Sequence, residues 1–336
     1  MEFPAKLSQA PRFKLAHLPT PIEKLTRFSA KLNGPEIHIK RDDLTGLATG
    51  GNKTRKLEFL IADALKQGAD TVITAGGPQS NHCRQTAAAC VRAGLACHLV
   101  FGGTPSDTLN GNRFLDHLLG AKEHWTPKGT RETKMESLAE ELRKAGKKPY
   151  LIPVGGSNSV GSLGYIFAMY ELATQIHEQN LDFTHIVFAT SSGGTQAGMV
   201  VGAKLANLKQ KLVAISIDQV PDGTSDFNYK KFVFDVAQKI NHDLQLGLTL
   251  NPEDFSMDYN YLGGGYGVVG DPERESIHLL AKTEGILVDP VYAGRALAGL
   301  IDKIRKKEFS KNDKILFWHT GGETALHAYV EELNNY

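Results

Sequence analysis

The chain has 336 residues, of which 41% are hydrophobic and 22% are charged, and its formal net charge is +1. This length accommodates two domains or one large α/β domain, and the composition is typical of a globular protein in water. The sequence contains no basic run interleaved with aromatic residues, which argues against nucleic-acid binding and favours a small-molecule partner.

Targeting signals and cysteines give further expectations. The first 25 residues mix charges with prolines, and no stretch is apolar over the length of a signal peptide core or a membrane span. We therefore expect a cytoplasmic protein without a membrane partner. The cysteines are Cys83, Cys90 and Cys97, and their odd number and wide spacing fit neither a disulfide framework nor a zinc site. We interpret them as small packing residues, and we expect no metal.

Three segments share the order of an apolar strand, a glycine-rich turn and a helix. They are "DTVITAGGPQSNHCRQTAAACVRAG", "THIVFATSSGGTQAGMVVGAKLA" and "KILFWHTGGETALHAYVEEL". Near-continuous apolar runs indicate strands buried on both faces, so we predict an α/β fold with a mostly parallel sheet. Ligands of such sheets bind beyond the carboxyl ends of the strands, where these three turns lie. The glycine- and serine-rich passage "YLIPVGGSNSVGSLGY" is interpreted as the joint between two halves.

The stretch "TGGNKTRKLEF" raises the question of whether Lys53 is a reactive amine. An amphipathic helix is predicted from the apolar residues Leu57, Leu60, Ile61, Ala64 and Leu65. Lys53 lies four residues before Leu57, on the buried side, whereas Arg55 falls on the opposite side as a solvated charge. Burial and the helix dipole would both lower the pKa of Lys53, which favours Schiff-base chemistry. The alternative is that Lys53 extends from the helix end into water.

Two of the glycine turns are candidate anion sites. "ATSSGGTQAG" offers backbone N–H groups, hydroxyls and a helix N-terminus, which suit one phosphate monoester. It lacks both the dinucleotide fingerprint and the nucleotide P-loop pattern, and an ordinary strand-to-helix connection is the alternative. In "GGPQSNHCRQ", Ser80, Asn81 and His82 begin a helix that could hold a carboxylate. His82 is interpreted either as an acid–base group or as part of the helix cap.

The combination of these motifs resembles the pyridoxal-phosphate (PLP) enzymes of the tryptophan-synthase-β fold. More narrowly, it is similar to the family of 1-aminocyclopropane-1-carboxylate (ACC) deaminase and D-cysteine desulfhydrase, with the desulfhydrases the nearer branch. The motifs are "IKRDDLTGLATGGNKTRKLE", "GGPQSNHCRQTAAA", "GGTQAGM", "GGGYGV", "EGILVDPVYAGRALAGL" and "HTGGETAL". The resemblance implies fold type II, with two domains that each contain an open, mostly parallel twisted sheet flanked by helices. The larger, PLP-binding domain would comprise residues 1–50 and 165–336, and the smaller one residues 51–164.

The resemblance also implies roles for individual residues. Lys53 would form the covalent bond to PLP. The PLP phosphate would be held by Asn52, Lys56, Ser191, Ser192, Gly193, Gly194 and Thr195. Asn81 would bond the ring hydroxyl, Tyr292 would lie against the ring, and Thr320 would stand at the pyridine nitrogen. The substrate would contact Ser80, Asn81, His82 and Tyr266, and the catalytic set would be Lys53, Ser80, Tyr266 and Tyr292.

Two positions bear on the reaction. ACC deaminases carry a glutamate that pairs with the pyridine nitrogen where this chain has Ala293, and a leucine where this chain, like D-cysteine desulfhydrases, has Thr320. A threonine hydroxyl makes the ring a weaker electron sink than a carboxylate does, which is sufficient when a good β-leaving group departs. We therefore expect α,β-elimination, with D-cysteine giving pyruvate, hydrogen sulfide and ammonia. Lys53 and Ser80 are both candidates for the base that removes the α-proton.

Several alternatives stay open from the sequence. The chain could be an ACC deaminase giving 2-oxobutyrate and ammonia, an L-cysteate sulfo-lyase, or a binding protein that uses the phosphate turn without covalent chemistry. Desulfhydrases usually have threonine or serine in place of Ala293 and a small apolar residue in place of Glu323. Glu323 is interpreted either as a capping-box carboxylate or as a group that reaches the site. The family also implies a homodimer.

Overall fold

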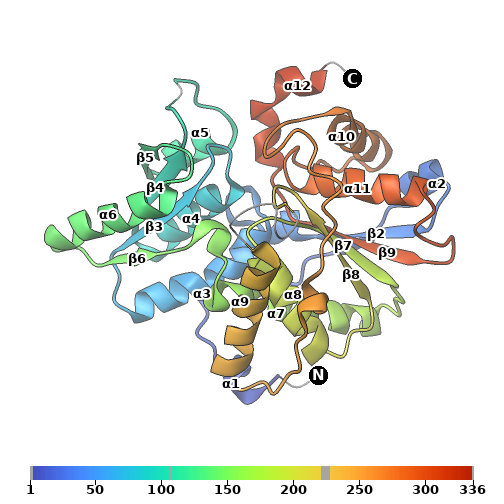
Figure 1. Ribbon diagram of the computed structural model, residues 1–336, viewed down its shortest axis with the longest axis horizontal. Helices are drawn as coiled ribbons and strands as arrows, with labels where there is room; N and C mark the ends of the chain where they lie inside the picture. The colour runs from blue at the N-terminus through green and yellow to red at the C-terminus, as the bar shows by residue number, and fades with distance from the viewer. Residues whose placement is uncertain (1–2, 106, 221–227, 335–336) are drawn as a thin grey trace.

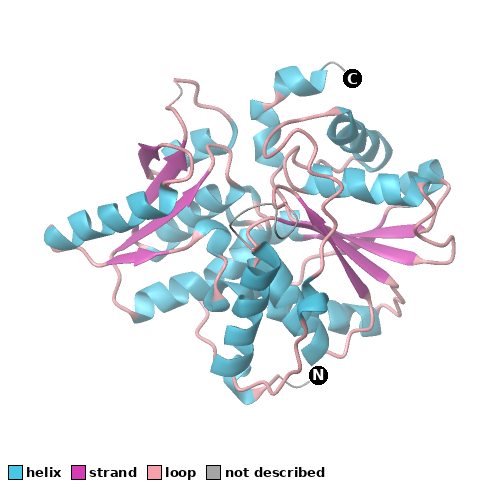
Figure 2. Ribbon diagram, viewed as in Figure 1, coloured by secondary structure: helices cyan, strands magenta, loops and turns pink. Residues whose placement is uncertain are grey.

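The computed structural model describes residues 3–105, 107–220 and 228–334. These residues form two β-sheets, each flanked by helices, with several helices between the sheets (Figures 1 and 2). The predicted α/β class with two mostly parallel sheets is therefore confirmed. Among the described residues, no helix is long and apolar enough to cross a membrane.

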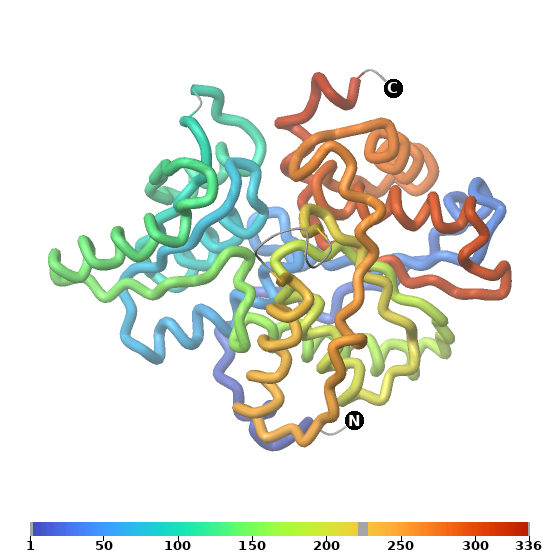
Figure 3. The backbone as a smooth tube through the Cα atoms, in the orientation of Figure 1, coloured from blue at the N-terminus to red at the C-terminus, as the bar shows by residue number. Residues whose placement is uncertain are grey.

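The larger sheet combines the two ends of the chain with its middle. Its strands, in spatial order, are β1 (Ile22–Lys24), β2 (Glu36–Arg41), β9 (Lys314–His319), β7 (His185–Thr190) and β8 (Lys211–Ser216). β1 pairs antiparallel with β2, and all other neighbours are parallel. The tube in Figure 3 shows β2, near the N-terminus, running beside β9, near the C-terminus.

Apolar residues cover both faces of this sheet, as the continuous apolar runs predict. On β7, Ile186 and Phe188 pack with one set of helices, while Val187 and Ala189 pack with the other. The first face is covered by α7 (Ser159–Glu178) and α8 (Gly194–Leu205), and the second by α2 (Thr26–Leu32), α10 (Asp271–Glu284) and α11 (Ala293–Arg305). Because helices cover both faces, the strands are buried, and only the strand ends are free to border a ligand site.

The smaller sheet is parallel throughout and uses residues 71–151. Its strands, in spatial order, are β5 (Lys122–Thr126), β4 (Ala96–Gly102), β3 (Thr71–Gly76) and β6 (Pro149–Leu151). Its helices are α3 (Asn52–Lys66), α4 (Asn81–Ala93), α5 (Gly111–Leu118) and α6 (Arg131–Lys144). The three cysteines are free and buried in the core beside β3, which confirms their interpretation as packing residues. The division at residues 50/51 and 164/165 stays a prediction.

The remaining described elements are one longer helix, two short helices and several 3-10 helices. The helices are α1 (Ala5–Ser8), α9 (Tyr229–Asp243) and α12 (Val330–Asn334). The 3-10 helices are η1 (Asp42–Thr45), η2 (Leu47–Thr49), η3 (Val154–Gly156), η4 (Pro252–Phe255) and η5 (Glu323–Ala328). Of these, η3, which precedes α7, contributes Val154 and Gly155 to the wall of the cavity described below.

The first turns of α3 are buried on all sides, which the sequence did not predict. This helix packs against α4 of the smaller unit and against α7 beneath the larger sheet. Its apolar stripe is present, but Thr54, Arg55 and Lys56 on the other sides are buried as well. A helix between two layers has no solvated face at its start.

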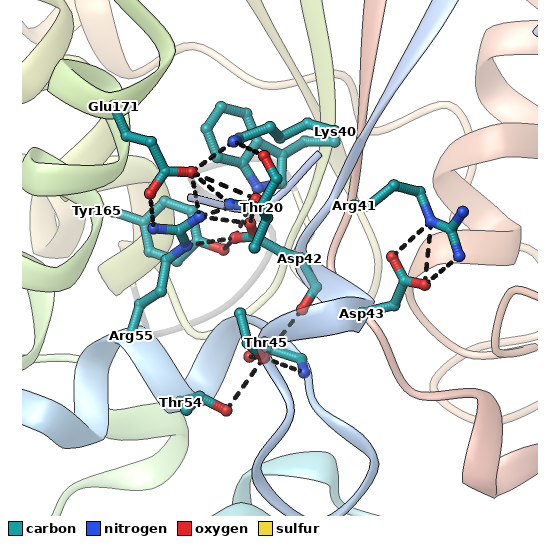
Figure 4. Close-up of polar contacts among 12 residues, drawn as sticks. Thr20, Lys40, Arg41, Asp42, Asp43, Thr45, Thr54, Arg55, Tyr165 and Glu171 are labelled. Carbon is teal, nitrogen blue, oxygen red and sulfur yellow. Dashed lines mark hydrogen bonds and ion pairs between the residues drawn. The ribbon is translucent and has the colours of Figure 1, made fainter. Parts of the chain in front are cut away.

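The prediction that Arg55 is a solvated charge is therefore wrong. Arg55 is only 1% exposed, and its guanidinium binds the carboxylates of Asp42 and Glu171 (Figure 4). Nε donates to Asp42 Oδ2 at 2.9 Å, and Nη1 donates to Glu171 Oε2 at 3.0 Å. Although burial opposes it, the charge of Arg55 lowers the pKa of Asp42 to about 2. Arg55 thus joins α3 to η1 and α7.

Candidate active site

A cavity of about 690 Å³ lies between the carboxyl ends of strands from both sheets. The glycine turns after β3, β7 and β9 all border it, as predicted from the three segments. The predicted site residues that line it are Asn52, Lys53, Ser80, Asn81, His82, Ser191, Ser192, Gly193, Thr195, Tyr266, Tyr292 and Thr320. Two others, Lys56 and Gly194, lie just behind this wall, where a Cβ on Gly194 would be 2.9 Å from Lys56 Nζ.

Lys53 enters the cavity from the first turn of α3. Its Nζ donates to the carbonyl oxygen of Gly155 at 3.3 Å, and Lys56 Nζ donates to the same oxygen at 3.1 Å. Burial lowers the pKa of Lys53 to about 8. Burial and the neighbouring amine lower the pKa of Lys56 well below its ordinary value. An amine that loses its proton near neutral pH is suited to covalent chemistry with a carbonyl group.

The turn after β7 forms a cradle at the start of α8. Gly193 has a φ of +81°, a conformation that glycine adopts without strain. A Cβ on Gly194 would lie 2.8 Å from the Cα of Ser157, so a side chain does not fit there. Ser157 Oγ accepts the N–H of Gly194 at 3.1 Å and donates to Ser192 Oγ at 2.9 Å. These groups surround the N-terminus of a helix, which is an anion site by its dipole and N–H groups.

Asn52 and Thr195 connect this cradle to α3. Asn52 Nδ2 donates to Thr195 Oγ1 at 3.1 Å, and Asn52 N donates to the carbonyl of Thr320 at 2.9 Å. The sequence-based search missed Ser157 and Gly155. Both lie in the passage interpreted as a joint, whose glycines and serines were a signal for a close approach of the backbone to a ligand.

The turn after β3 positions three predicted residues at the start of α4. Ser80 is the cap, because its Oγ accepts the N–H of Cys83 at 3.3 Å. Asn81 Oδ1 accepts from Asn112 Nδ2 at 2.9 Å, which leaves the Asn81 amide nitrogen directed toward Gly322. The earlier N–H groups of this turn, those of Asn81 and His82, are the ones suited to an anion at the cavity wall.

His82 is not the helix cap, which corrects one of the two interpretations. Its Nε2 lies 2.7 Å from Thr74 Oγ1, and that hydroxyl donates its proton to Ile152 O at 2.8 Å. His82 Nε2 must therefore be the donor to Thr74. Burial and the charges of Lys53 and Lys56 lower the pKa of His82 well below its ordinary value, so the ring is neutral. Its Nδ1 is an acceptor without a hydrogen-bond partner among the described residues.

Two tyrosines form the side of the cavity that belongs to the larger unit. The hydroxyl oxygens of Tyr266 and Tyr292 lie 2.5 Å apart, with the rings edge to face. Asp289, which was not singled out in the sequence, accepts the N–H groups of Val291, Tyr292 and Ala293. This buried carboxylate therefore fixes the backbone at Tyr292, and burial raises the pKa of Asp289 to about 6.

Glu323 fits neither role that was considered for it. The cap of η5 is Gly322, no side-chain bond caps this helix, and Glu323 is not among the residues that line the cavity. Its Oε2 is buried and has no hydrogen-bond partner within the described part of the chain. Burial raises the pKa of Glu323.

Three charged residues of the cavity wall, Lys128, Arg131 and Asp218, were also missed. Asp218 follows β8, and Arg131 begins α6 after β5. Burial raises the pKa of Asp218, opposed by hydrogen bonds from Ser191 and Gln219 and by the charges of Arg131 and Arg295. No motif in the sequence marks any of these positions. Among the described residues, no cluster of three or more His, Cys, Asp or Glu side chains could hold a metal ion.

Comparison with known proteins identifies the class to which this fold and site belong. Residues 13–321 match the family of pyridoxal-phosphate dependent enzymes, and the chain belongs to this family. More particularly, it is 37% identical to the crystal structure of an ACC deaminase homologue, with a TM-score of 0.89 over 98% of this chain and 97% of that one. The predicted relation to the ACC deaminase and D-cysteine desulfhydrase family is thereby confirmed.

Two more distant structures share the fold alone. O-ureido-L-serine synthase is 17% identical with a TM-score of 0.65, over 97% of this chain and 94% of that one. A pyridoxal 5'-phosphate-dependent aspartate racemase is 20% identical with a TM-score of 0.65, over 94% of each chain. These relatives catalyse different reactions, so the fold by itself does not specify one.

The cofactor is pyridoxal 5'-phosphate, and the cavity has groups that fit it. The amine of Lys53, with its lowered pKa, suits the aldehyde, and the cradle before α8 suits the phosphate. Bound PLP supplies an electron sink for the carbanion that forms at the α-carbon of an amino acid. The Lys53 amine and the cradle lie on either side of Gly155, where a Cβ would contact both Ser192 Oγ and Lys53 Nζ, so one ligand can reach both.

Proposed function

We propose that the protein is a lyase that performs α,β-elimination on a β-substituted amino acid, with D-cysteine as the favoured substrate. The products are pyruvate, hydrogen sulfide and ammonia, with one water consumed. The observation that carries this proposal is the Lys53 amine, with a pKa of about 8, between the start of α4 and the cradle of α8. The same groups would bind other amino-acid substrates in the same way.

In this mechanism some residues hold the cofactor, some bind the substrate, and Asn81 does both. Asn52, Lys56 and residues 191–195 would hold the phosphate of the cofactor, Asn81 would bond the ring hydroxyl, and Tyr292 would lie against the ring. The first turn of α4, with Ser80, Asn81 and His82, binds the substrate carboxylate through its N–H groups and side chains. Because the His82 ring is neutral with a bare Nδ1, its contribution to carboxylate binding is its backbone N–H rather than its imidazole.

The α-proton is moved by Lys53 Nζ or Ser80 Oγ. The lowered pKa of Lys53 lets its amine accept a proton near neutral pH. Ser80 Oγ lies at the cavity wall as an acceptor of the Cys83 N–H. Tyr266 faces the substrate, and its contact with Tyr292 orients both hydroxyls.

The choice of elimination rests on Thr320 and Ala293. Thr320 lines the cavity, and Ala293 begins α11 without a side-chain carboxylate. Thr320 is placed at the pyridine nitrogen in this proposal, where its hydroxyl gives a weaker electron sink than a carboxylate would. Such a site favours substrates whose β-substituent leaves readily. The similarity to an ACC deaminase homologue supports ACC deamination as the second candidate, followed by L-cysteate sulfo-lyase activity.

A substrate panel tests this proposal. Pyruvate and 2-oxobutyrate are measured with D-cysteine, L-cysteine, L-cysteate and ACC as substrates, and pyruvate from D-cysteine is expected to be the fastest product. If ACC gives 2-oxobutyrate and no thiol substrate gives pyruvate, the proposed reaction is wrong and the protein is an ACC deaminase.

The Lys53→Ala variant tests the role of the lysine. It should abolish borohydride-stable labelling by PLP, and labelling of another lysine would contradict the role of Lys53. The homodimer and the cytoplasmic location remain predictions, and light scattering tests the first.

A further inference from the structure

Arg131 lies on the same edge of the smaller sheet as the predicted carboxylate site. Gly76 pairs with Phe101, so Gly102 at the end of β4 lies beside Gly77, in the turn that leads to Ser80. A Cβ on Gly102 would lie 3.2 Å from Arg131 Cδ, which means that the arginine stem crosses the end of β4. Neighbouring strands are about 4.8 Å apart, so Arg131 starts one strand away from the α4 turn.

The guanidinium of Arg131 is unpaired within the described part of the chain. Its charge acts on Asp218, across the cavity, and on Cys83, next to Ser80, but no hydrogen bond or ion pair within the described residues engages it. Arg131 is half-buried, and the fully buried arginines nearby differ from it, because Arg55 binds two carboxylates and Arg84 donates to the carbonyl of Gly50. A cation that lines a partly desolvated cavity without a partner is suited to an anionic ligand.

We propose that Arg131 determines substrate specificity by binding a negatively charged substituent on the β-carbon of the substrate. This inference rests on the proposed function, because it requires the α-carboxylate to be held by the start of α4. With that group fixed, the β-substituent can extend along the sheet edge from Gly77 toward Gly102 and meets the guanidinium. Amino acids with a sulfonate or carboxylate on the β-carbon are the class that such a site favours, and hydrosulfide leaving from cysteine would meet the same charge.

The test compares two amino acids that differ only in this substituent. Aspartate carries a carboxylate on the β-carbon, whereas alanine carries nothing, and neither has a good leaving group. Their dissociation constants are measured on the holoenzyme from the change in cofactor absorbance, with both enantiomers. Arg131→Gln should weaken aspartate binding by about tenfold or more and leave alanine binding within about twofold, since a charged hydrogen bond is lost. Arg131→Lys should retain part of the aspartate affinity.

Controls separate the possible failures. Lys128 is exposed at the mouth of the same cavity, and Lys128→Gln should change aspartate binding by less than about twofold if position rather than overall charge matters. Equal weakening of alanine and aspartate in Arg131→Gln would overturn the inference, because it would assign Arg131 to the α-carboxylate. Unchanged binding of both would overturn it as well.

A second measurement keeps the inference testable if the proposed function fails. If no amino acid changes the cofactor absorbance, the assignment of the cavity to amino-acid substrates is wrong. Calorimetric titration of the holoenzyme with methanesulfonate then decides the role of Arg131 alone. Heat of binding that is lost in Arg131→Gln supports the anion site, and equal binding to both proteins rejects it.

Discussion

Lys53 and Lys56 lie one turn apart at the start of α3, and both Nζ atoms donate to the carbonyl of Gly155. Two ammonium groups cannot share one acceptor in a buried place without strong repulsion, so deprotonation of at least one is favoured. The pKa values of both amines are lowered, with burial as the main cause. Helical spacing predicted that Lys53 points inward. The acceptor that it shares with Lys56 lies in the loop before α7, which the spacing could not predict.

The pH dependence of cofactor attachment follows from Lys53. Its amine gains reactivity as pH rises through about 8, because the deprotonated form is the nucleophile. The rate of PLP attachment to the apoprotein should therefore rise with a midpoint near pH 8. Asp218→Asn should move the midpoint lower, because the Asp218 charge raises the pKa of Lys53. A midpoint near the ordinary lysine value, unchanged in the variant, would contradict both statements.

The protonation of the His82 ring depends on groups that lie elsewhere in the sequence. Its proton position is set by Thr74, and the Thr74 hydroxyl is in turn set by the carbonyl of Ile152. From the sequence, His82 was interpreted as part of the helix cap or as an acid–base group. The bond to Thr74 and the nearby lysine charges explain why it is a neutral ring that is anchored at Nε2.

The element that we propose to hold the phosphate is the start of α8, together with the loop that precedes α7 and contacts it. Gly194 faces Ser157 so closely that the two segments form one surface. The residue types of the turn after β7 predicted a phosphate site. The participation of Ser157 was not predictable from local pattern, because it comes from a segment 37 residues earlier in the chain.

Substitution of Gly194 tests this arrangement. In Gly194→Ala, the new Cβ would meet the backbone of Ser157 and the Nζ of Lys56, so the cradle must open. We expect a loss of PLP affinity of about tenfold or more, as removal of one or two charge-assisted hydrogen bonds would cause. Equilibrium dialysis measures the affinity. Far-UV circular dichroism of the variant should match the wild-type protein, and unchanged affinity would exclude a role for this turn.

The whole molecule is connected through α3, which lies between the two units. Arg55 on this helix binds Asp42, which begins η1 after β2, and Glu171 on α7. Figure 4 shows the Arg55 guanidinium between the two carboxylates, with Tyr165 and Thr20 beside them. These contacts fix the helix that carries Lys53 relative to the larger sheet.

Removal of the Arg55 charge should destabilise the protein strongly. Arg55→Met leaves Asp42 buried beside Glu171 with Lys40 as the remaining cation, which should lower the free energy of unfolding by about 3–5 kcal/mol. Urea unfolding measures the change, and Lys231→Met, in an exposed pair with Asp235, is the control with an expected change of less than 1 kcal/mol. If Arg55→Met does not fold, Arg55→Lys gives an intermediate loss. A loss below 1 kcal/mol in Arg55→Met would show that the cluster is not needed.

The sequence by itself determined the features that depend on neighbours along the chain. Continuous apolar runs specified strands buried on both faces, glycine turns indicated which strand ends border the cavity, and spacing from Leu57 directed Lys53 inward. The tertiary structure alone decided the burial of Arg55, the proton position on His82, the contact of Ser157 with the turn before α8, and the presence of Arg131 at the cavity. The physical reason is that periodicity identifies one buried face of a helix, whereas α3 is covered from two sides, by α4 and by the sequence-distant α7.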